Sequence, residues 1–381
     1  IFFSSLEFIR SFILGGFPWN LIAFSWTNHL QFLQVISIVG TYSFNLLSVT
    51  IFLIPSIIFF NYSKIEKLFF LVFALFILMI NFSYGSLILK TKDNKNEIDL
   101  DFVIKIISPK ININRFFQNE NPEKIILELI KLSNPNSLEK SIFIFPEGAL
   151  SNIYLEDLKN YSYLFSKNYS DQHKIVIGIN SIEENKIFNS LAVLDKDLNV
   201  LAKYNKNKLV PFGEFLPFEN FLSKFGIKKI TQGYSSFSSD NKRNLINLNS
   251  INFLPLICYE IIYSGKLNKN NEDFDLILNI SEDGWFGESV GPYQHFSHSI
   301  FRSIEEGKNL IRSGNNGISA FINQKGEIIN QIKSTERGLI EVKSFVKSKK
   351  TPFSSSGNKI FFYFLIFYIS LFFFLKIGEN K

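Results

Sequence analysis

The sequence predicts a membrane protein in which transmembrane helices carry a large α/β domain, and three observations support this. Residues 68–89, LFFLVFALFILMINFSYGSLIL, contain no charged residue, and about 20 apolar residues allow a helix to cross a bilayer. Hydrophobic residues make up 46% of the chain, with 44 phenylalanines. Between residues 92 and 355, short strand-like runs alternate with helical patterns, which is typical of a sheet covered by helices.

Further membrane segments lie near both ends of the chain. Residues 43–60 (SFNLLSVTIFLIPSIIFF) form a second candidate span, in which Pro55 is expected to kink the helix. Residues 360–375 (IFFYFLIFYISLFFFL) form a third. Residues 1–14 resemble the end of an earlier span, and residues 15–26 (GGFPWNLIAFSW) have the aromatic and proline content of an interfacial loop.

These segments divide the chain into three expected parts. Residues 1–91 form a partial membrane domain, residues 92–355 the α/β domain, and residues 356–381 a last membrane helix. Because the chain begins with Ile1 and its only methionine is Met79, we expect it to be a fragment that lacks its natural start.

Lysines in short loops predict the orientation. Lys64 and Lys67 lie between two candidate spans, and Lys376 and Lys381 follow the last one. Positive residues in short loops favour the cytoplasmic side, so the α/β domain is expected on the extracytoplasmic side. The net charge of +6 is interpreted as part of this signal. No basic helix or aromatic-interleaved basic stripe indicates a nucleic-acid partner.

The elements of the α/β domain can be placed in order. Residues 122–133 have a helical pattern, with Ile125, Leu129 and Leu132 on one face and Pro122 near the start. Residues 292–313 form a longer candidate helix. The strand-like runs are residues 141–145, 174–179, 190–195, 254–259, 275–280 and 317–323.

Two of the polar stretches that follow strands carry candidate acid and base groups. Glu147 follows the run IFIF and Pro146, where a carboxylate can act as a general base; it could equally be an acid at a helix N-terminus. The stretch YNKNKLVPFGEFLP follows Lys203 and contains Lys206 and Lys208. A lysine beside this apolar turn can stabilise an oxyanion, and the alternative is a solvated basic loop.

The third stretch, LPLICYEI, contains Cys258, the only cysteine of the chain. A lone cysteine in an apolar strand is usually a small buried hydrophobe. A thiol at a strand-to-helix turn can instead be activated by the helix N-terminus and a nearby cation, and then act as a nucleophile.

Several blocks in chain order resemble the nitrilase, or carbon–nitrogen hydrolase, superfamily, and most closely its membrane-bound branch that acylates lipoproteins. The blocks are PEGA, YNKNKLVPFGEFLP, ICYE, DGWFG, GPYQHF, RSGNNGISA and TPFSSSGN. The resemblance implies a nitrilase-like α-β-β-α sandwich with Glu147 as general base, Lys206 as oxyanion-stabilising cation and Cys258 as nucleophile. Lys206 is chosen because it stands eight residues before Glu214. Supporting roles are implied for Glu214, Tyr259, Glu260 and Trp285.

The resemblance also implies the reaction. An acyl chain would pass from a phospholipid, through a thioester on Cys258, to the N-terminal amine of a diacylglyceryl-cysteine lipoprotein. No cofactor or metal is implied, and a monomer in the bacterial inner membrane, with the catalytic domain on the periplasmic side, is expected. Two stretches depart from the family pattern. Glu282 stands before Asp283 where Asn is common, and residues 106–117, the expected first strand of the domain, read IISPKININRFF where a QGN-like stretch is usual.

Three alternatives are left open. A membrane-tethered amidase or nitrilase would use the same triad, but water would attack the thioester. A Cys–His enzyme would use His295 or His298, which lie three residues apart on a predicted helix; two histidines alone do not make a metal site, which needs three or four ligands. A non-enzymatic membrane scaffold would leave the triad unused.

Overall fold

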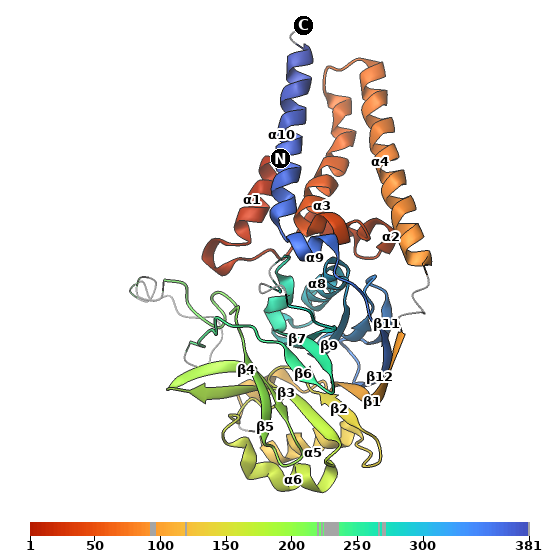
Figure 1. Ribbon diagram of the computed structural model, residues 1–381. Helices are drawn as coiled ribbons and strands as arrows, with labels where there is room; N and C mark the ends of the chain where they lie inside the picture. Colours follow the sequence, from red (N-terminus) through yellow and green to blue (C-terminus); the bar gives the residue numbers. More distant parts are fainter. Residues whose placement is uncertain are drawn as a thin grey trace.

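The computed structural model describes residues 1–91, 97–118, 120–218, 221, 224, 236–265, 267–268 and 272–379. Long helices from both ends of the chain stand together at one end of the molecule, and two sheets lie at the other (Figure 1). The predicted boundary at residue 92 and the charge of Lys381 fall outside the described residues.

The helical end comes from the first 90 residues and the last helix. Its elements are α1 (Phe2–Arg10), η1 (Ile13–Gly15), η2 (Ile22–Trp26), α2 (Leu30–Leu33), α3 (Ile36–Leu53), η3 (Ile54–Phe59), α4 (Lys64–Lys90) and α10 (Lys359–Glu379). Residues 36–59 and 64–90 are long and apolar enough to cross a membrane, and residues 359–373 are a shorter apolar helix. The second candidate span therefore begins earlier than predicted, and Pro55 lies where α3 passes into the tighter turns of η3.

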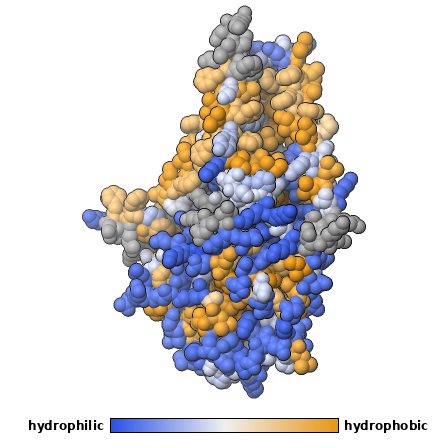
Figure 2. Space-filling view, viewed as in Figure 1, coloured by the Kyte–Doolittle hydropathy of each residue, from blue (hydrophilic) through white to orange (hydrophobic). Residues whose placement is uncertain are grey.

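Helix α4 exposes most of its apolar side chains. Only 17% of the most apolar window of α4 is buried, and Phe69, Phe73 and Phe76 on this helix are exposed. Figure 2 shows the helical end as a hydrophobic surface above a largely hydrophilic body. A surface of this kind fits contact with lipid far better than contact with water.

Helix α3 contains a break near its first turn. Gly40 has φ +75 and ψ 169, in a region open to glycine because it has no Cβ. A Cβ at this position would lie 2.0 Å from the ring of Phe353. Phe353 belongs to the short helix α9 (Pro352–Ser356), so the break lets α9 pack directly against α3.

The α/β part contains two six-stranded sheets. The first has the order β12-β1-β2-β3-β4-β5 and the second β11-β10-β9-β8-β7-β6. Its strands are β1 (Glu97–Ser108), β2 (Ser141–Ile144), β3 (His173–Glu183), β4 (Lys186–Leu194), β5 (Val200–Asn205), β6 (Ile246–Leu248), β7 (Ile251–Ile257), β8 (Leu276–Glu282), β9 (Asn309–Asn315), β10 (Ser319–Ile322), β11 (Ile328–Ile332) and β12 (Gly338–Val346). The central pairs β1–β2, β2–β3, β7–β8 and β8–β9 are parallel.

The two sheets pack face to face between helices. Apolar residues of both sheets, such as Ile142 and Leu256, belong to one buried core. Helices α5 (Pro122–Ser133) and α6 (Ser162–Asn168) share a second core with the first sheet, and α8 (Gly291–Glu306) packs on the second sheet. The layers are therefore helix, sheet, sheet and helix, as expected.

Short turns complete the α/β part and lie beside the strand ends. They are η5 (Ile113–Phe116), η6 (Leu158–Tyr161), η8 (Cys258–Ile262) and η9 (Gly284–Phe286). The predicted helix over 122–133 is confirmed as α5, with Asn121 as its N-cap.

Two predicted elements are wrong in extent. The helix predicted over 292–313 ends at Glu306, because Gly307 adopts φ +65, and residues 309–315 form β9. The predicted first strand, residues 106–117, is a strand only as far as Ser108. Strand β1 begins at Glu97 and ends at Ser108, and η5 follows. Pro109, which has no backbone N–H to donate, and Lys110, whose φ is +52, explain why the strand stops there.

Candidate active site

Three strand ends meet at one cavity. Glu147 comes three residues after β2, Lys206 directly follows β5, and Cys258 directly follows β7. All three side chains line a cavity of about 210 Å³. Since β2 and β5 belong to the first sheet and β7 to the second, the cavity lies between the two sheets. The structure thus brings together the three residues proposed from the sequence.

The carboxylate of Glu147 is held on both oxygens. Its Oε1 accepts from Asn189 Nδ2 at 2.7 Å and lies 3.3 Å from Lys206 Nζ. Its Oε2 accepts from the backbone N–H of Glu282 at 2.9 Å. Three donors from three different segments therefore fix this group, which is only 7% exposed.

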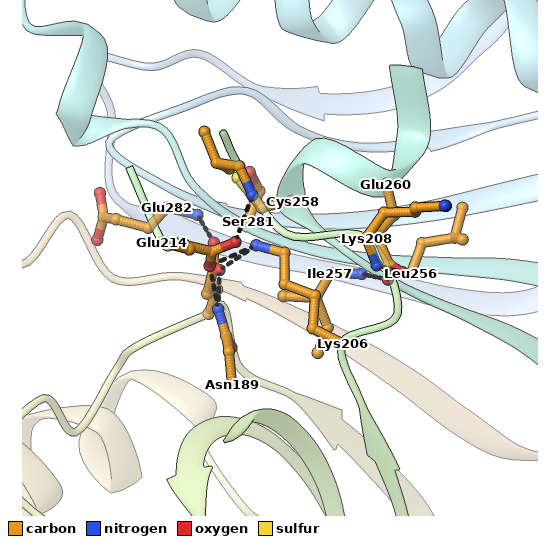
Figure 3. A network of polar contacts seen from close by, with 12 residues as sticks. Asn189, Lys206, Lys208, Glu214, Leu256, Ile257, Cys258, Glu260, Ser281 and Glu282 are labelled. Carbon is orange, nitrogen blue, oxygen red and sulfur yellow. Dashed lines mark hydrogen bonds and ion pairs between the residues drawn. The ribbon is translucent and has the colours of Figure 1, made fainter. Parts of the chain in front are cut away.

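Lys206 lies completely buried between two carboxylates. Its Nζ is 2.8 Å from Glu214 Oε1 as well as 3.3 Å from Glu147 Oε1 (Figure 3). Burial alone would lower the pKa of Lys206, but the charges of Glu147 and Glu214 outweigh it and hold the pKa well above its ordinary value. Lys206 is therefore a permanent cation. Lys203, by contrast, pairs with Glu183 outside the cavity.

Cys258 occupies a constrained turn. Its φ is +49, a region uncommon for residues other than glycine. Burial, and after it the charge of Glu147, raises the pKa of the Cys258 thiol well above its ordinary value, while Lys206 opposes this rise. Ser281 lies close to Cys258 (Figure 3), and its hydroxyl donates to Asp283 Oδ1 at 2.7 Å. The resting group is thus a thiol, which needs a base in order to become a nucleophile.

Glu260 connects the nucleophile turn to the lysine loop. One of its oxygens accepts from Ile257 N at 2.8 Å, and the other from Asn207 N at 3.0 Å and Lys208 N at 3.1 Å. Arg243 pairs with the same buried carboxylate. Glu260 is not among the residues that line the cavity, so it supports the site by holding the backbone on both sides of it.

Aromatic residues form the walls of the cavity, and two of them come from the helical end. Phe17 and Trp19 line the cavity together with Tyr259 and Trp285. The Tyr259 hydroxyl donates to the carbonyl of Gly16. Trp285 is 44% exposed, which places it at the rim. The predicted supporting residues Tyr259 and Trp285 therefore belong to the wall.

His295 and His298 do not act on the sulfur. His295 Nε2 lies 3.2 Å from the backbone oxygen of Cys258, and its Nδ1 lies 2.8 Å from Asp283. Burial and the charge of Arg312 lower the pKa of His295, and Asp283 opposes this shift. His298 faces the carbonyl of Trp19. His295 lines the cavity, but both of its ring nitrogens face oxygen atoms and not the sulfur, so the geometry does not favour the Cys–His alternative.

Asn189 is the cavity residue that sequence reasoning missed. Its Nδ2 donates to Glu147 Oε1 and, at 3.0 Å, to Glu214 Oε1. It lies inside β4, next to Ser190, where nothing local distinguishes it from other asparagines. Its role follows only from the fold, which places Glu147 and Glu214 within hydrogen-bond distance of its side chain.

Comparison with known proteins agrees with this architecture. A family model described as carbon–nitrogen hydrolase matches residues 126–344, more than half of the chain. A second model, the N-terminal domain of apolipoprotein N-acyltransferase, matches residues 1–54. The chain belongs to the carbon–nitrogen hydrolase family and, within it, to the apolipoprotein N-acyltransferases, as the sequence resemblance predicted.

Individual relatives match over most of the chain. A protein of Rickettsia prowazekii (strain Madrid E) named apolipoprotein N-acyltransferase is 31% identical, over 97% of this chain and 74% of its own length. One of the same name from Rhizobium leguminosarum bv. trifolii is 31% identical over 89% of this chain. The chain spans 65% of the length of that relative.

A solved structure of a carbon–nitrogen hydrolase superfamily protein from Xanthomonas campestris is also similar. It is 15% identical, with a TM-score of 0.45, and the match covers 65% of this chain and 91% of that one.

Proposed function

We propose that this chain transfers a fatty acyl chain from a phospholipid to the N-terminal amine of a diacylglyceryl-cysteine lipoprotein, through a thioester on Cys258. The observation that carries this proposal is the meeting of an acid, a permanent cation and a thiol in one cavity. The relatives named apolipoprotein N-acyltransferase support the class of acceptor.

The first half-reaction loads the enzyme. Glu147 takes the proton of the Cys258 thiol, and the sulfur attacks the ester carbonyl of the phospholipid. Lys206 stabilises the negative charge that develops on the carbonyl oxygen. When the ester C–O bond breaks, Glu147 returns the proton to the leaving oxygen. A lysophospholipid departs, and the acyl group stays on sulfur.

The second half-reaction transfers the acyl group. The neutral amine of the lipoprotein attacks the thioester carbonyl, again beside Lys206. Glu147 takes a proton from the attacking nitrogen, the C–S bond breaks, and the sulfur recovers that proton. The product is an amide, and the enzyme returns to its starting state. Two substrates that share one covalent intermediate give ping-pong kinetics.

We also propose that the chain spans the bacterial inner membrane with its α/β part on the periplasmic side. The exposed apolar helices support the membrane location, and Lys64 and Lys67 in the first turn of α4, next to the short connection from the preceding helix, support the orientation. Both substrates carry acyl chains, so a site next to the helical end can receive them without lifting them far from the bilayer. The aromatic residues Phe17 and Trp19 offer an apolar surface there.

Intact mass after incubation with phospholipid tests the loading step. The native chain is expected to gain the mass of one acyl group, and Cys258→Ala none. Ser181→Ala is a matched control, because Ser181 is buried in β3 outside the cavity and bonds only to Ser190 among its side-chain partners. An adduct that persists on Cys258→Ala, or its absence from the native chain, would refute the proposed intermediate.

A labelled acyl donor with a diacylated lipopeptide tests the acceptor. Label on the peptide amine supports transfer. Release of the label as free fatty acid alone would favour the hydrolase alternative, in which water attacks the same thioester.

A further inference from the structure

A buried ion pair lies directly behind Glu147 and has no role in the reaction proposed above. Arg115 in η5 pairs with Glu282 at the end of β8. The side chains are 0% and 1% exposed. Arg115 lies in the stretch 106–117, so both partners come from the two places where the sequence departs from the family pattern. The two stretches that depart from the family pattern are therefore in direct contact.

Arg115 holds the backbone on one side of the catalytic carboxylate. Its Nε donates to the carbonyl of Gly148, the residue that follows Glu147, at 3.0 Å. Gly148 has φ +59, and a Cβ there would lie 2.8 Å from the ring of Phe116. The chain therefore turns sharply just after Glu147, and the guanidinium binds the outer side of that turn.

Glu282 holds the carboxylate from the other side. Its backbone N–H is the donor to Glu147 Oε2. Its own carboxylate accepts from Gly284 N at 2.7 Å and from Asn315 Nδ2 at 2.7 Å, in addition to Arg115. Burial raises the pKa of Glu282, and the charge of Arg115 opposes this rise.

We propose that Arg115 and Glu282 form a clamp that positions Glu147 for proton transfer with Cys258. Through its planar fork, Arg115 contacts the Gly148 carbonyl and the Glu282 carboxylate at the same time. Lysine keeps the charge but has a single donor atom, so it cannot reproduce the fork. Both are positioning residues, because Arg115 does not line the cavity and Glu282, which does, acts on Glu147 through its backbone N–H. The inference rests on the proposed role of Glu147 as general base.

Alkylation of Cys258 by iodoacetamide tests the clamp without any lipid. Cys258 is the only cysteine of the 381 residues, so the alkylation rate measured by intact mass reports on this thiol alone. Native alkylation should depend weakly on pH near neutrality, because Glu147 removes the proton. In Arg115→Lys it should slow at pH 7 by about 10- to 100-fold, the effect of a misplaced catalytic group. The rate should then rise steeply with pH and approach the native rate in alkali, as in Glu147→Gln.

Arg302→Lys is the matched control. Arg302 is equally buried and pairs with Glu305 on α8, but it does not contact Glu147 or Gly148. Its alkylation should follow the native profile. Glu282→Gln alters the other partner of the clamp. It should shift the pH profile of alkylation in the same direction as Arg115→Lys. If Arg115→Lys does not fold, Glu282→Gln alone tests the clamp.

Each other result overturns a definite part of the account. If the clamp variants have the native pH profile while alkylation of Glu147→Gln is slow, the clamp proposal is wrong and the proposed function stands. An unchanged profile for Glu147→Gln would overturn the base and the clamp together. An equal loss in Arg302→Lys would show that general destabilisation, and not positioning, slows the thiol.

Discussion

Lys206 is the residue on which the electrostatics of the cavity depend. It is the cation between Glu147 and Glu214, and it is fully buried. Two carboxylates this close in a buried site would repel one another and would be poorly solvated without it. The same charge faces the cavity where the oxyanion would form. Its structural role and its proposed catalytic role therefore depend on the same charge.

Lys206→Met is expected to affect both roles. The buried pair loses its cation, which should reduce the free energy of unfolding by about 3–5 kcal/mol, and acylation of Cys258 should be lost. Chemical denaturation in detergent and intact mass measure the two effects. Lys203→Met, three residues away and paired with Glu183 in a partly exposed position, should change stability by less than about 1 kcal/mol. Comparable losses in both variants would contradict this account.

Single residues of the site differ in how well the sequence predicts them. Glu147, Lys206 and Cys258 each follow a strand within a distinctive motif. The local pattern left a helix-terminal acid, a solvated lysine loop and a buried cysteine open, and the family resemblance selected these three residues. Asn189 and Arg115 lie inside a strand and in a short turn. Their importance depends on contacts with Glu147 and Gly148, which are distant in the chain. Such contacts have no local sequence signal.

Helix α8 is the element that connects the helical end to the cavity. Near its first turns, His295 reaches the carbonyl of Cys258. At its other end, Glu305 Oε1 accepts from the backbone N–H and the hydroxyl of Thr41, each at 2.6 Å. Thr41 follows the break at Gly40, so Glu305 caps the part of α3 that begins there.

Gly40→Ala tests the importance of this break. The new Cβ would clash with Phe353 at a positive φ, and we expect a loss of about 2–5 kcal/mol in the free energy of unfolding. Gly287→Ala separates the two causes, because Gly287 has φ +57 but nothing lies within 4 Å of its Cβ position. It should cost only about 1–2 kcal/mol. Equal losses would mean that the contact with α9 is unimportant.

The end of α8 should also make stability depend on pH. Ser354 Oγ donates to Glu306 Oε2 at 2.6 Å, and burial raises the pKa of Glu306 from 4.5 to about 7. Because the folded pKa lies above the unfolded one, the contribution of Glu306 to stability is fully present below about pH 4.5. It is lost as the pH rises through about 7.

Glu306→Gln keeps an oxygen for Ser354 and removes this titration. It should stabilise the chain at pH 8 by on the order of 1–3 kcal/mol and change little at pH 4.5, measured as denaturation midpoints at both values. Glu128→Gln, on the exposed face of α5, should show no such difference between the two pH values. A Glu306→Gln effect that is equal at both values would refute the raised pKa.

Elements were harder to predict where polar residues lie inside strands. β9 reads NLIRSGN and is buried throughout, yet its sequence continues the helical pattern of α8. Arg312 is tolerated there because Asp283 pairs with it at 2.8 Å. The predicted helix extends to residue 313 because Gly307 is the only sequence signal for its end. Apolar strands such as β2, β7 and β8 were predicted within a few residues.

The molecule as a whole has two unlike ends, an apolar group of helices and a polar α/β body (Figure 2). The two ends are joined by buried contacts between α3, α8 and α9, including those of Glu305 and Phe353. The body is therefore fixed relative to the helices, and the proposed orientation in the membrane determines which side of the bilayer the cavity faces.

Single cysteines introduced in a Cys258→Ala background test that orientation. Leu138→Cys lies at an exposed position of the α/β body, and Lys64→Cys lies at the start of α4. A membrane-impermeant maleimide applied to spheroplasts should label Leu138→Cys and spare Lys64→Cys, and both should react once the membrane is opened. The reverse pattern would place the body in the cytoplasm and contradict the proposed location.

The segment around Gly16, which supplies Phe17 and Trp19 to the cavity, has a practical consequence. The Trp19 indole donates to Gln294 at 2.7 Å, and Tyr259 and Tyr263 both donate to the glycine carbonyls before it. One wall of the cavity is thus held in place by contacts between residues nearly 250 positions apart in the chain. A truncated α/β domain that began after α4 would keep the triad but lose Phe17 and Trp19. Its cavity would be open on the side from which lipid substrates are expected to enter.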